Sequence, residues 1–186
     1  MKKGGKGSAH TRTGQAFEDK VDLVDYVSKQ ANYRVVPLHY ENSTNDTKDV
    51  FEVFYKGNLK AHLFKKHGFY KFLSSNGIDW RKHIARKLIP DSGVYVITEG
   101  TLFIIEMKTQ HTEGTVDEKL QTCGFKLRQY RRLVSELDLK VEYCYILSDW
   151  FKKDKYRDVL DYIRETECDY CFYPIDLAKL GLSFLE

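Results

Sequence analysis

The spacing of hydrophobic residues along this chain changes several times between helical and strand-like patterns, and each change predicts a different element. Phe17, Val21 and Val24 recur at helical spacing and Thr13 is a good N-cap, so we expect a helix over residues 13–31. Runs rich in apolar, aromatic and β-branched residues then predict strands. These strands are expected over residues 33–40, 50–55, 92–98, 101–105, 141–147 and 169–173.

Between the predicted strands the apolar residues return to helical spacing. Residues 56–87 fit two or three short helices, and Asp79 is placed to cap one over residues 80–88. Residues 117–137 predict a long amphipathic helix, and residues 150–164 predict another. The element order α, β, β, β, α, β, α, β predicts an α/β fold with a mixed central sheet and flanking helices.

The two strands in the middle of the chain predict a hairpin that brings charged residues together. With a two-residue turn at residues 99–100, partner positions place Asp91 opposite Lys108 and Gly93 opposite Glu106. Glu106 and Lys108 are two residues apart, so they share one face of the strand. Directly opposed Cβ atoms lie roughly 4.5–5.5 Å apart, so Asp91 is expected to join them.

These charges follow a strand that is apolar at every position. Residues 103–105 show no polar alternation, which is typical of a strand buried on both faces. Charges at the end of such a strand are costly unless they are paired or bind a metal. Two carboxylates suit Mg²⁺, which activates water and stabilises phosphoryl charge, and an ammonium beside them can hold the water or the phosphate. The alternative is an ordinary hairpin with a salt bridge at its open end.

The motif Pro90-Asp91, a gap, and Glu106-x-Lys108 after an apolar strand resembles the PD-(D/E)XK nuclease superfamily. The resemblance implies a restriction-endonuclease-like α-β-β-β-α-β core that hydrolyses DNA with Mg²⁺, for which Mn²⁺ can substitute. It implies that Asp91 and Glu106 bind the metal and that Lys108 assists the water or the phosphate. The stretch Gly14 to Glu18 matches a G-x-x-F-E pattern of the same superfamily and nominates Glu18 as a further catalytic acid.

A narrower resemblance rests on residues 7–18, on the motif and on the helix after it. These segments resemble the small subunits of heterodimeric type IIS restriction endonucleases, in which a larger subunit recognises the DNA sequence and each subunit cuts one strand. That resemblance implies a prokaryotic restriction-modification enzyme. One alternative is a homodimeric junction-resolving or repair nuclease of the same superfamily. An alternative of another class is a non-catalytic DNA-binding or interaction subunit.

The basic residues concentrate in the half of the chain that carries the motif. Residues 1–108 hold 18 Lys and Arg against 12 Asp and Glu, whereas residues 109–186 hold 12 against 15. A DNA partner would therefore dock on the motif half. Residues 56–87 contain one acid, Asp79, and supply the candidate contacts to double-stranded DNA, although a solvated helical face is the alternative. The candidate DNA-binding residues are Lys65, Lys66, Arg81, Lys82, Arg86 and Lys87.

The remaining features bound the class of protein. We expect one nuclease domain over residues 1–186, in which residues 1–12 form a flexible basic arm. No stretch has transmembrane length, so we expect no membrane partner and a cytoplasmic protein. Its four cysteines should then remain reduced, and buried free thiols are favoured over a metal or redox site. In the helix after the motif, Lys119 or Gln121 could lie near a bound phosphate.

Overall fold

A seven-stranded sheet organises the chain in this computed structural model, which describes residues 16–17, 21–38, 49–110 and 116–183. The strands lie in the sheet in the order of the sequence, β1 to β7. They are β1 (Tyr33–Pro37), β2 (Val50–Tyr55), β3 (Asn58–Lys65), β4 (Ser92–Val96), β5 (Thr101–Lys108), β6 (Lys140–Leu147) and β7 (Asp169–Phe172).

The pairing of neighbouring strands changes once across the sheet, from antiparallel to parallel. Neighbours from β1 to β5 are antiparallel, whereas β5, β6 and β7 run parallel to one another. Parallel neighbours need a crossover connection, and helices supply it in both cases. The predicted α/β class with a mixed central sheet is therefore confirmed.

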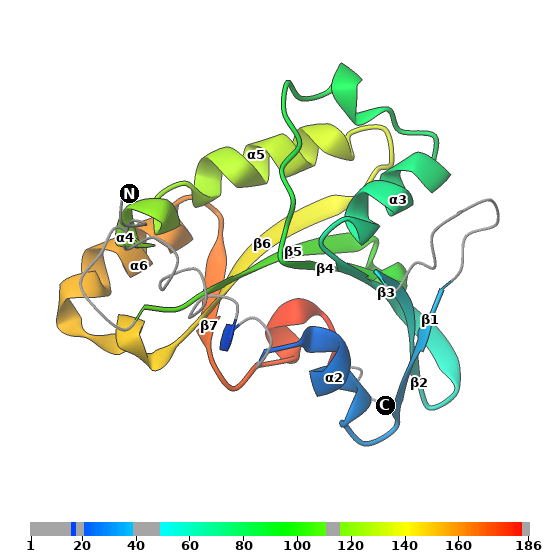
Figure 1. Cartoon of the computed structure of the whole chain (residues 1–186), viewed down its shortest axis with the longest axis horizontal. Coiled ribbons are helices and arrows are strands. Elements are labelled where there is room, and N and C mark those ends of the chain that lie inside the picture. Colours follow the sequence, from blue (N-terminus) through cyan, green and yellow to red (C-terminus); the bar gives the residue numbers. More distant parts are fainter. Residues whose placement is uncertain (1–15, 18–20, 39–48, 111–115, 184–186) are drawn as a thin grey trace, which may run out of the picture.

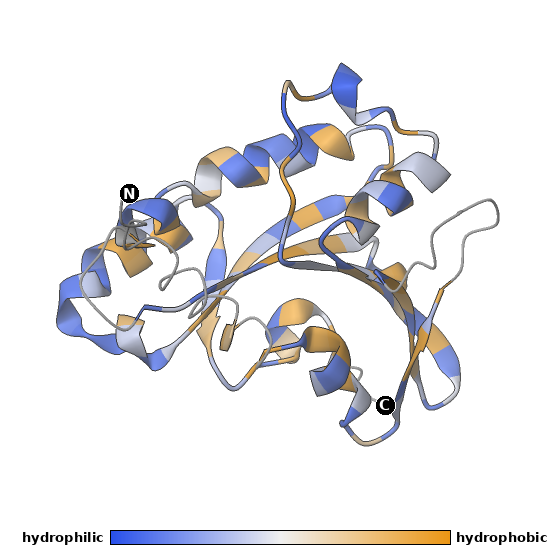
Figure 2. Ribbon diagram, viewed as in Figure 1, coloured by the Kyte–Doolittle hydropathy of each residue, from blue (hydrophilic) through white to orange (hydrophobic). Residues whose placement is uncertain are grey.

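Helices cover both faces of the sheet (Figure 1). The larger apolar core lies on the face covered by α3 (Gly68–Ser75), α4 (Val116–Leu120), α5 (Cys123–Leu133) and α6 (Arg157–Glu165). The smaller core lies on the opposite face, under α2 (Leu23–Ser28) and the 3-10 turn η5 (Ala178–Leu180). The apolar positions of α2 and α5 alternate with polar ones along each helix, as expected for helices that cover a sheet (Figure 2).

Strand β3 lies where short helices were predicted, so that part of the prediction is wrong. The strand begins after a two-residue turn in which Lys56 and Gly57 have φ values of +48° and +82°. Positive φ at both positions matches the right-handed twist of a β-hairpin, and Gly57 adopts it without a steric penalty. Ala61 and Leu63 then belong to the core on one face, while Phe64 belongs to the core on the other.

The helix predicted over residues 80–88 shortens to the 3-10 turn η1 (Trp80–Lys82). Asp79 caps this turn as expected, because its carboxylate accepts a hydrogen bond from the Arg81 amide at 3.2 Å. Beyond it the Tyr70 hydroxyl hydrogen bonds to both the amide and the carbonyl of Leu88, at 2.9 Å each. These two bonds satisfy the Leu88 backbone outside a helix and hold the chain that leads to β4.

Three other predicted helices begin later than expected or are interrupted. Within the helix predicted over residues 13–31, residues 16–17 are helical, and the separate helix α2 begins at Leu23, where the Asp22 carboxylate caps it by accepting from the Val24 amide at 3.0 Å. The helix predicted over residues 117–137 divides into α4 and α5, and Thr122 forms the N-cap of α5. The helix predicted over residues 150–164 begins as two 3-10 turns, η3 (Asp149–Lys152) and η4 (Asp154–Tyr156), before α6.

The cysteines are free and buried, as predicted. Cys168 packs in the larger core and Cys171 in the smaller one, so the two thiols of the C-x-x-C sequence contribute to opposite faces of the sheet. Within the described residues, none of the helices combines the length and the apolar surface needed to cross a membrane.

Gly181 provides a test of the packing between η5 and the sheet. Its φ is +64°, and a Cβ atom there would lie 2.7 Å from Phe103 Cε2 and 2.9 Å from Val96 Cγ2. Gly100 has a similar φ of +58° with no atom within 4 Å of the same position. We expect Gly100→Ala to cost about 1–2 kcal/mol of unfolding free energy from left-handed strain alone. Gly181→Ala should cost about 1–3 kcal/mol more, because it also overpacks the core.

Chemical denaturation of the two variants measures this difference. Equal losses of stability in Gly181→Ala and Gly100→Ala would contradict the close packing of η5 against β4 and β5.

Candidate active site

The hairpin of β4 and β5 sets the position of the candidate residues, and its register differs from the prediction by two residues. A 3-10 turn over Ile97–Glu99, closed by Gly100, replaces the expected two-residue turn. Gly93 therefore lies opposite Ile104 rather than Glu106. A shift of two residues preserves the face on which each side chain lies, because the side chains of a strand alternate with a period of two. Asp91, Glu106 and Lys108 therefore lie on one face as predicted, although the predicted register is wrong.

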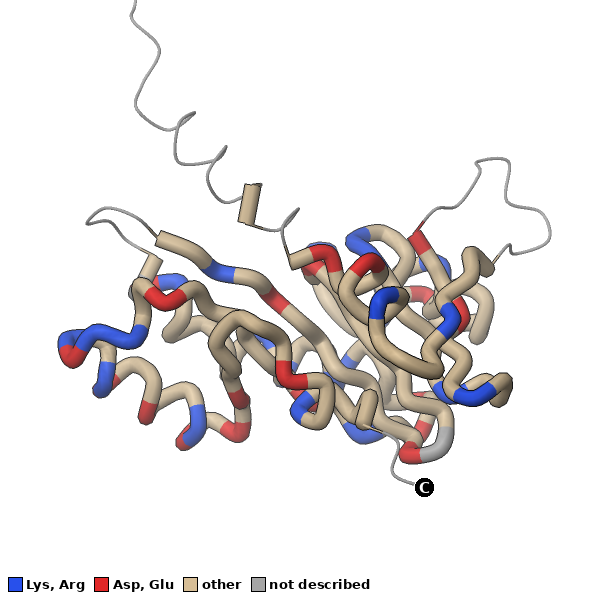
Figure 3. Tube along the Cα trace, turned by 90° about the horizontal axis from the view of Figure 1, so that it is seen from below, with Lys and Arg blue, Asp and Glu red and all other residues tan. Residues whose placement is uncertain are grey.

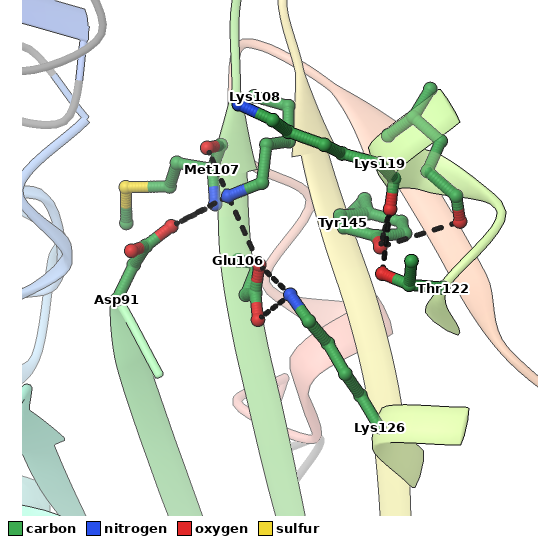
Figure 4. Close-up of polar contacts among 9 residues, drawn as sticks. Asp91, Glu106, Met107, Lys108, Lys119, Thr122, Lys126 and Tyr145 are labelled. Carbon is green, nitrogen blue, oxygen red and sulfur yellow. Dashed lines mark hydrogen bonds and ion pairs between the residues drawn. The ribbon is translucent and has the colours of Figure 1, made fainter. Parts of the chain in front are cut away.

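Asp91, Glu106 and Lys108 come together at the carboxyl end of β5 (Figure 4). The Lys108 ammonium lies 3.3 Å from Asp91 Oδ2 and 3.0 Å from Glu106 Oε2. Asp91 Oδ2 also accepts a hydrogen bond from the Met107 amide at 2.7 Å, which ties the start of β4 to the end of β5. Both carboxylates therefore contact the same ammonium nitrogen and lie close to each other.

A fourth charged group completes the site. The ammonium of Lys126, on α5, lies 2.6 and 2.7 Å from the two carboxylate oxygens of Glu106. Lys126 was not among the predicted site residues, although its position in the sequence carries a signal. Lys126 follows Cys123 by three residues and precedes Tyr130 by four, and both of those residues are buried. A lysine on the buried stripe of a helix is unusual, and here it faces a buried carboxylate.

Burial and charge act in opposite directions on the ionisable groups of the site. Burial raises the pKa of Glu106, but the ammonium groups of Lys108 and Lys126 outweigh it and hold this pKa below its ordinary value. Burial likewise lowers the pKa of Lys108, but Glu106 and Asp91 outweigh it and hold this pKa above its ordinary value. Both groups therefore stay charged at neutral pH. Lys108 is suited to supply positive charge rather than to accept a proton.

Lys119 and Gln121, which the sequence suggests as neighbours of a bound phosphate, form no hydrogen bond or ion pair with the four charged side chains described at the site. Lys119 is exposed, and its carbonyl accepts a hydrogen bond from the Tyr145 hydroxyl at 3.4 Å (Figure 4). Gln121 is also exposed and lines a different hollow, beside α6. The predicted single helix divides between α4 and α5, so the face on which Lys119 lies is not continuous with the face of α5 that carries Lys126.

The oxygen atoms of the site fit a hard divalent cation. Besides the two carboxylates, the Met107 carbonyl lies 3.1 Å from the Lys108 ammonium, so three oxygens surround one positive charge. Carboxylate and carbonyl oxygens are ligands of Mg²⁺ and Mn²⁺, and Mg²⁺ takes one or two carboxylates and keeps several waters. Among the residues described, no cluster of three or more His, Cys, Asp or Glu side chains is present, and the candidate site itself contributes two carboxylates.

Two other predicted features lie outside the described residues. Glu18, the further catalytic acid that the resemblance nominates, is among them, as is the whole basic arm over residues 1–12. Neither has a described position relative to Asp91 and Glu106.

The candidate DNA-binding residues are distributed over both faces of the sheet. Lys65 forms an ion pair with Asp22 of α2, on the face opposite α5. The backbone amide of Lys66 donates to the Asp91 carbonyl at 3.4 Å, next to the site. Elsewhere in the same basic segment Lys71 pairs with Asp49 at 3.4 Å. The acids that pair with Lys65 and Lys71 thus come from elsewhere in the sequence, and acidic and basic positions are interspersed along the chain (Figure 3).

The other candidates lie on the α5 face. Arg81 pairs with Asp79 at 3.3 Å, and Lys82 is exposed beside it. Arg86 and Lys87 line a groove of about 490 Å³ that also contains Glu106. Of the candidate set, these two residues therefore share a groove with Glu106, whereas Lys66 adjoins Asp91 through its backbone.

The contribution of Lys126 to stability can be measured by removing its charge. Lys126→Met keeps most of the apolar stem but leaves Glu106 with Lys108 as its remaining cation. We expect the unfolding free energy to fall by about 1–3 kcal/mol, because a buried charged acceptor loses a partner. Lys119→Met is the matched control, since the same substitution at an exposed position should change stability by less than about 0.5 kcal/mol.

Urea denaturation at neutral pH gives both values. A Lys126→Met variant as stable as the Lys119→Met control would show that the close contact between Lys126 and Glu106 does not persist in solution.

We compared the chain with models of protein families, with curated proteins and with solved structures, and none of them matched.

Proposed function

We propose that this chain is a Mg²⁺-dependent endonuclease that cleaves one strand of double-stranded DNA. In this proposal it is the cleavage subunit of a heterodimeric type IIS restriction endonuclease whose larger subunit recognises the sequence. The observation that carries the proposal is the convergence of Asp91, Glu106 and the Met107 carbonyl on the single ammonium of Lys108. Three oxygens that already surround one cation can supply part of the coordination shell of a hard divalent ion, and waters would supply the rest.

Each charged residue then has a distinct role. A divalent ion bound by Asp91 and Glu106 would lower the pKa of a bound water and stabilise charge on a phosphoryl oxygen. Lys108 and Lys126, displaced from the carboxylates, would face the phosphate and stabilise its developing negative charge. Phosphoryl transfer depends largely on positioning and electrostatics, so these four side chains are chemically sufficient for the reaction.

The element order also supports the proposal. Three antiparallel strands, β3 to β5, are followed by α5 and then by the parallel strand β6. With α2 before the sheet, the elements of the α-β-β-β-α-β core that the sequence resemblance implies occur in this order, with β1, β2, α3 and α4 as additional elements. The motif lies at the carboxyl end of the internal strand β5, which carries both Glu106 and Lys108.

The heterodimeric role rests on the resemblance and on one chemical consideration. The described residues provide one such site, and one site hydrolyses one phosphodiester at a time. Cleavage of both strands would therefore require a second site, in a larger subunit or in another copy of this chain.

Metal binding is the first experiment, because it does not depend on a partner subunit. Mn²⁺ is titrated, with detection by electron paramagnetic resonance, into the parent and the Asp91→Ala/Glu106→Ala variant, with a short duplex DNA present. We expect the parent to bind Mn²⁺ and the double variant to lose that binding, because the carboxylate ligands are gone. Asp161→Ala, which removes an exposed carboxylate on α6, should bind as the parent does.

Equal or absent Mn²⁺ binding in the parent and the double variant would contradict the nuclease proposal. A basic, non-catalytic DNA-binding subunit would then be the better account. Loss of binding in the double variant alone would direct further work to the partner and to the strand that is cut.

The Lys108→Met variant tests whether the Lys108 ammonium competes with the metal for the three oxygens. The Lys108 ammonium lies where an entering cation would approach the three oxygens, so its removal should strengthen Mn²⁺ binding. We expect about tenfold tighter binding, the scale of one charge-assisted hydrogen bond of ~1.5 kcal/mol. Lys119→Met is again the matched control, and weaker binding in Lys108→Met than in this control would contradict the proposed geometry.

A further inference from the structure

A groove opens beside the candidate catalytic groups, between α5 and the chain that leads from η1 to β4. Its volume is about 490 Å³. Glu106 and Tyr130 lie at its inner end, and Lys126 contacts Glu106 there. Any molecule in this groove would therefore lie next to the carboxylate that is proposed to bind the metal.

The outer walls of the groove are apolar. Phe125, on α5, is 62% exposed and is the most exposed large apolar side chain among the described residues. Ile89, on the opposite wall, is 45% exposed. Figure 2 shows apolar positions both on α5 and on the chain opposite it. Single exposed apolar residues are common, but two that line one groove next to an active site indicate a binding surface.

The charges of the groove favour an anionic occupant. Arg86, Lys87 and Lys126 line it, and Glu106 is the one acid among its described lining residues. Glu106 is already compensated by two ammonium groups. Lys87 also lines an adjoining hollow, where its ammonium lies 4.6 Å from the centre of the Tyr70 ring. The occupant that fits is an anion with a flat apolar part, which is the chemistry of a nucleotide.

We propose that this groove binds one unpaired nucleotide of the DNA substrate, adjacent to the phosphate that is cleaved. Phe125 stacks on the base, Ile89 contacts the other side of the nucleoside, and Arg86 and Lys87 contact the flanking phosphate. This inference rests on the proposed nuclease function and names its substrate class more closely. The site is selective for DNA in which a nucleotide leaves the helix.

The stacking geometry gives the reason for an unpaired nucleotide. In an intact duplex both faces of a base are covered by its neighbours, so an aromatic side chain reaches a base face only when that base leaves the stack. A surface that contacted only the phosphates of a paired duplex would need cations but not exposed apolar walls. The combination of Phe125 with Arg86 and Lys87 thus distinguishes the two modes of binding.

Fluorescence anisotropy without metal tests the groove independently of catalysis. Three labelled DNAs are compared: a paired duplex, the same duplex with one bulged thymidine, and the same duplex with a bulged abasic nucleotide. We expect the parent to bind the thymidine bulge about tenfold more tightly than the other two, the scale of stacking one base on an aromatic side chain. Phe125→Ala should lose this preference, and Phe125→Tyr should keep it.

Tyr162→Ala is the matched control, because Tyr162 is an exposed aromatic residue of α6 that does not line this groove. It should keep the preference. Equal affinity of the parent for all three DNAs, or an undiminished preference in Phe125→Ala, would overturn the inference. So would a Phe125→Ala variant that binds every DNA normally but fails to assemble with a protein partner, since the groove would then be a protein interface.

The Asp91→Ala variant separates this inference from the proposed function, because Asp91 is a proposed metal ligand that does not line the groove. A preference for the thymidine bulge that persists in this variant, after Mn²⁺ binding is lost, supports the groove as a distinct nucleotide site. A parent that binds Mn²⁺ but shows no preference overturns the groove alone and leaves the metal site in place.

Discussion

The buried charge of Glu106 is the constraint on which the rest of the site depends. Glu106 ends an otherwise apolar stretch of β5 and is covered by α5, where an unpaired carboxylate would cost several kcal/mol. Lys108 and Lys126 supply two ammonium groups that keep it ionised. Because these partners come from β5 and α5, the strand and the helix must be correctly placed before the charge can be tolerated.

The same balance of charge determines how the site can respond to ligands. Asp91 and Glu106 are matched by Lys108 and Lys126, so the four side chains together carry almost no net charge. A divalent cation that enters must displace ammonium groups from the carboxylates, and the site then becomes positive. In the proposed reaction an anionic substrate would restore the balance, which would link metal binding to the binding of a phosphate. Arg86 and Lys87, which line the nearby groove, would add positive charge for such a substrate.

The predicted and observed elements differ where contacts between residues that are separated in the sequence decide the local structure. The helix expected over residues 80–88 is short because the Tyr70 hydroxyl, distant in sequence, binds the Leu88 backbone. The basic residues at positions 65 and 71 looked unpaired because their acids lie elsewhere in the sequence, and folding brings Asp22 and Asp49 to them. Strand β3 was missed because its short apolar run fits either period until its neighbours in the sheet are known.

By itself the sequence determined the α/β class, the strands other than β3 and the residue types at the end of β5. Apolar runs and the period-two alternation of side chains are local properties, and for this reason even a register wrong by two residues kept Asp91, Glu106 and Lys108 on one face. The tertiary structure alone decided that Lys126 is the partner of Glu106 and that Lys65 faces away from the site. Those contacts depend on where α5 and α2 pack against the sheet. Packing of that kind follows from the summed burial of many side chains, which no single segment of the sequence encodes.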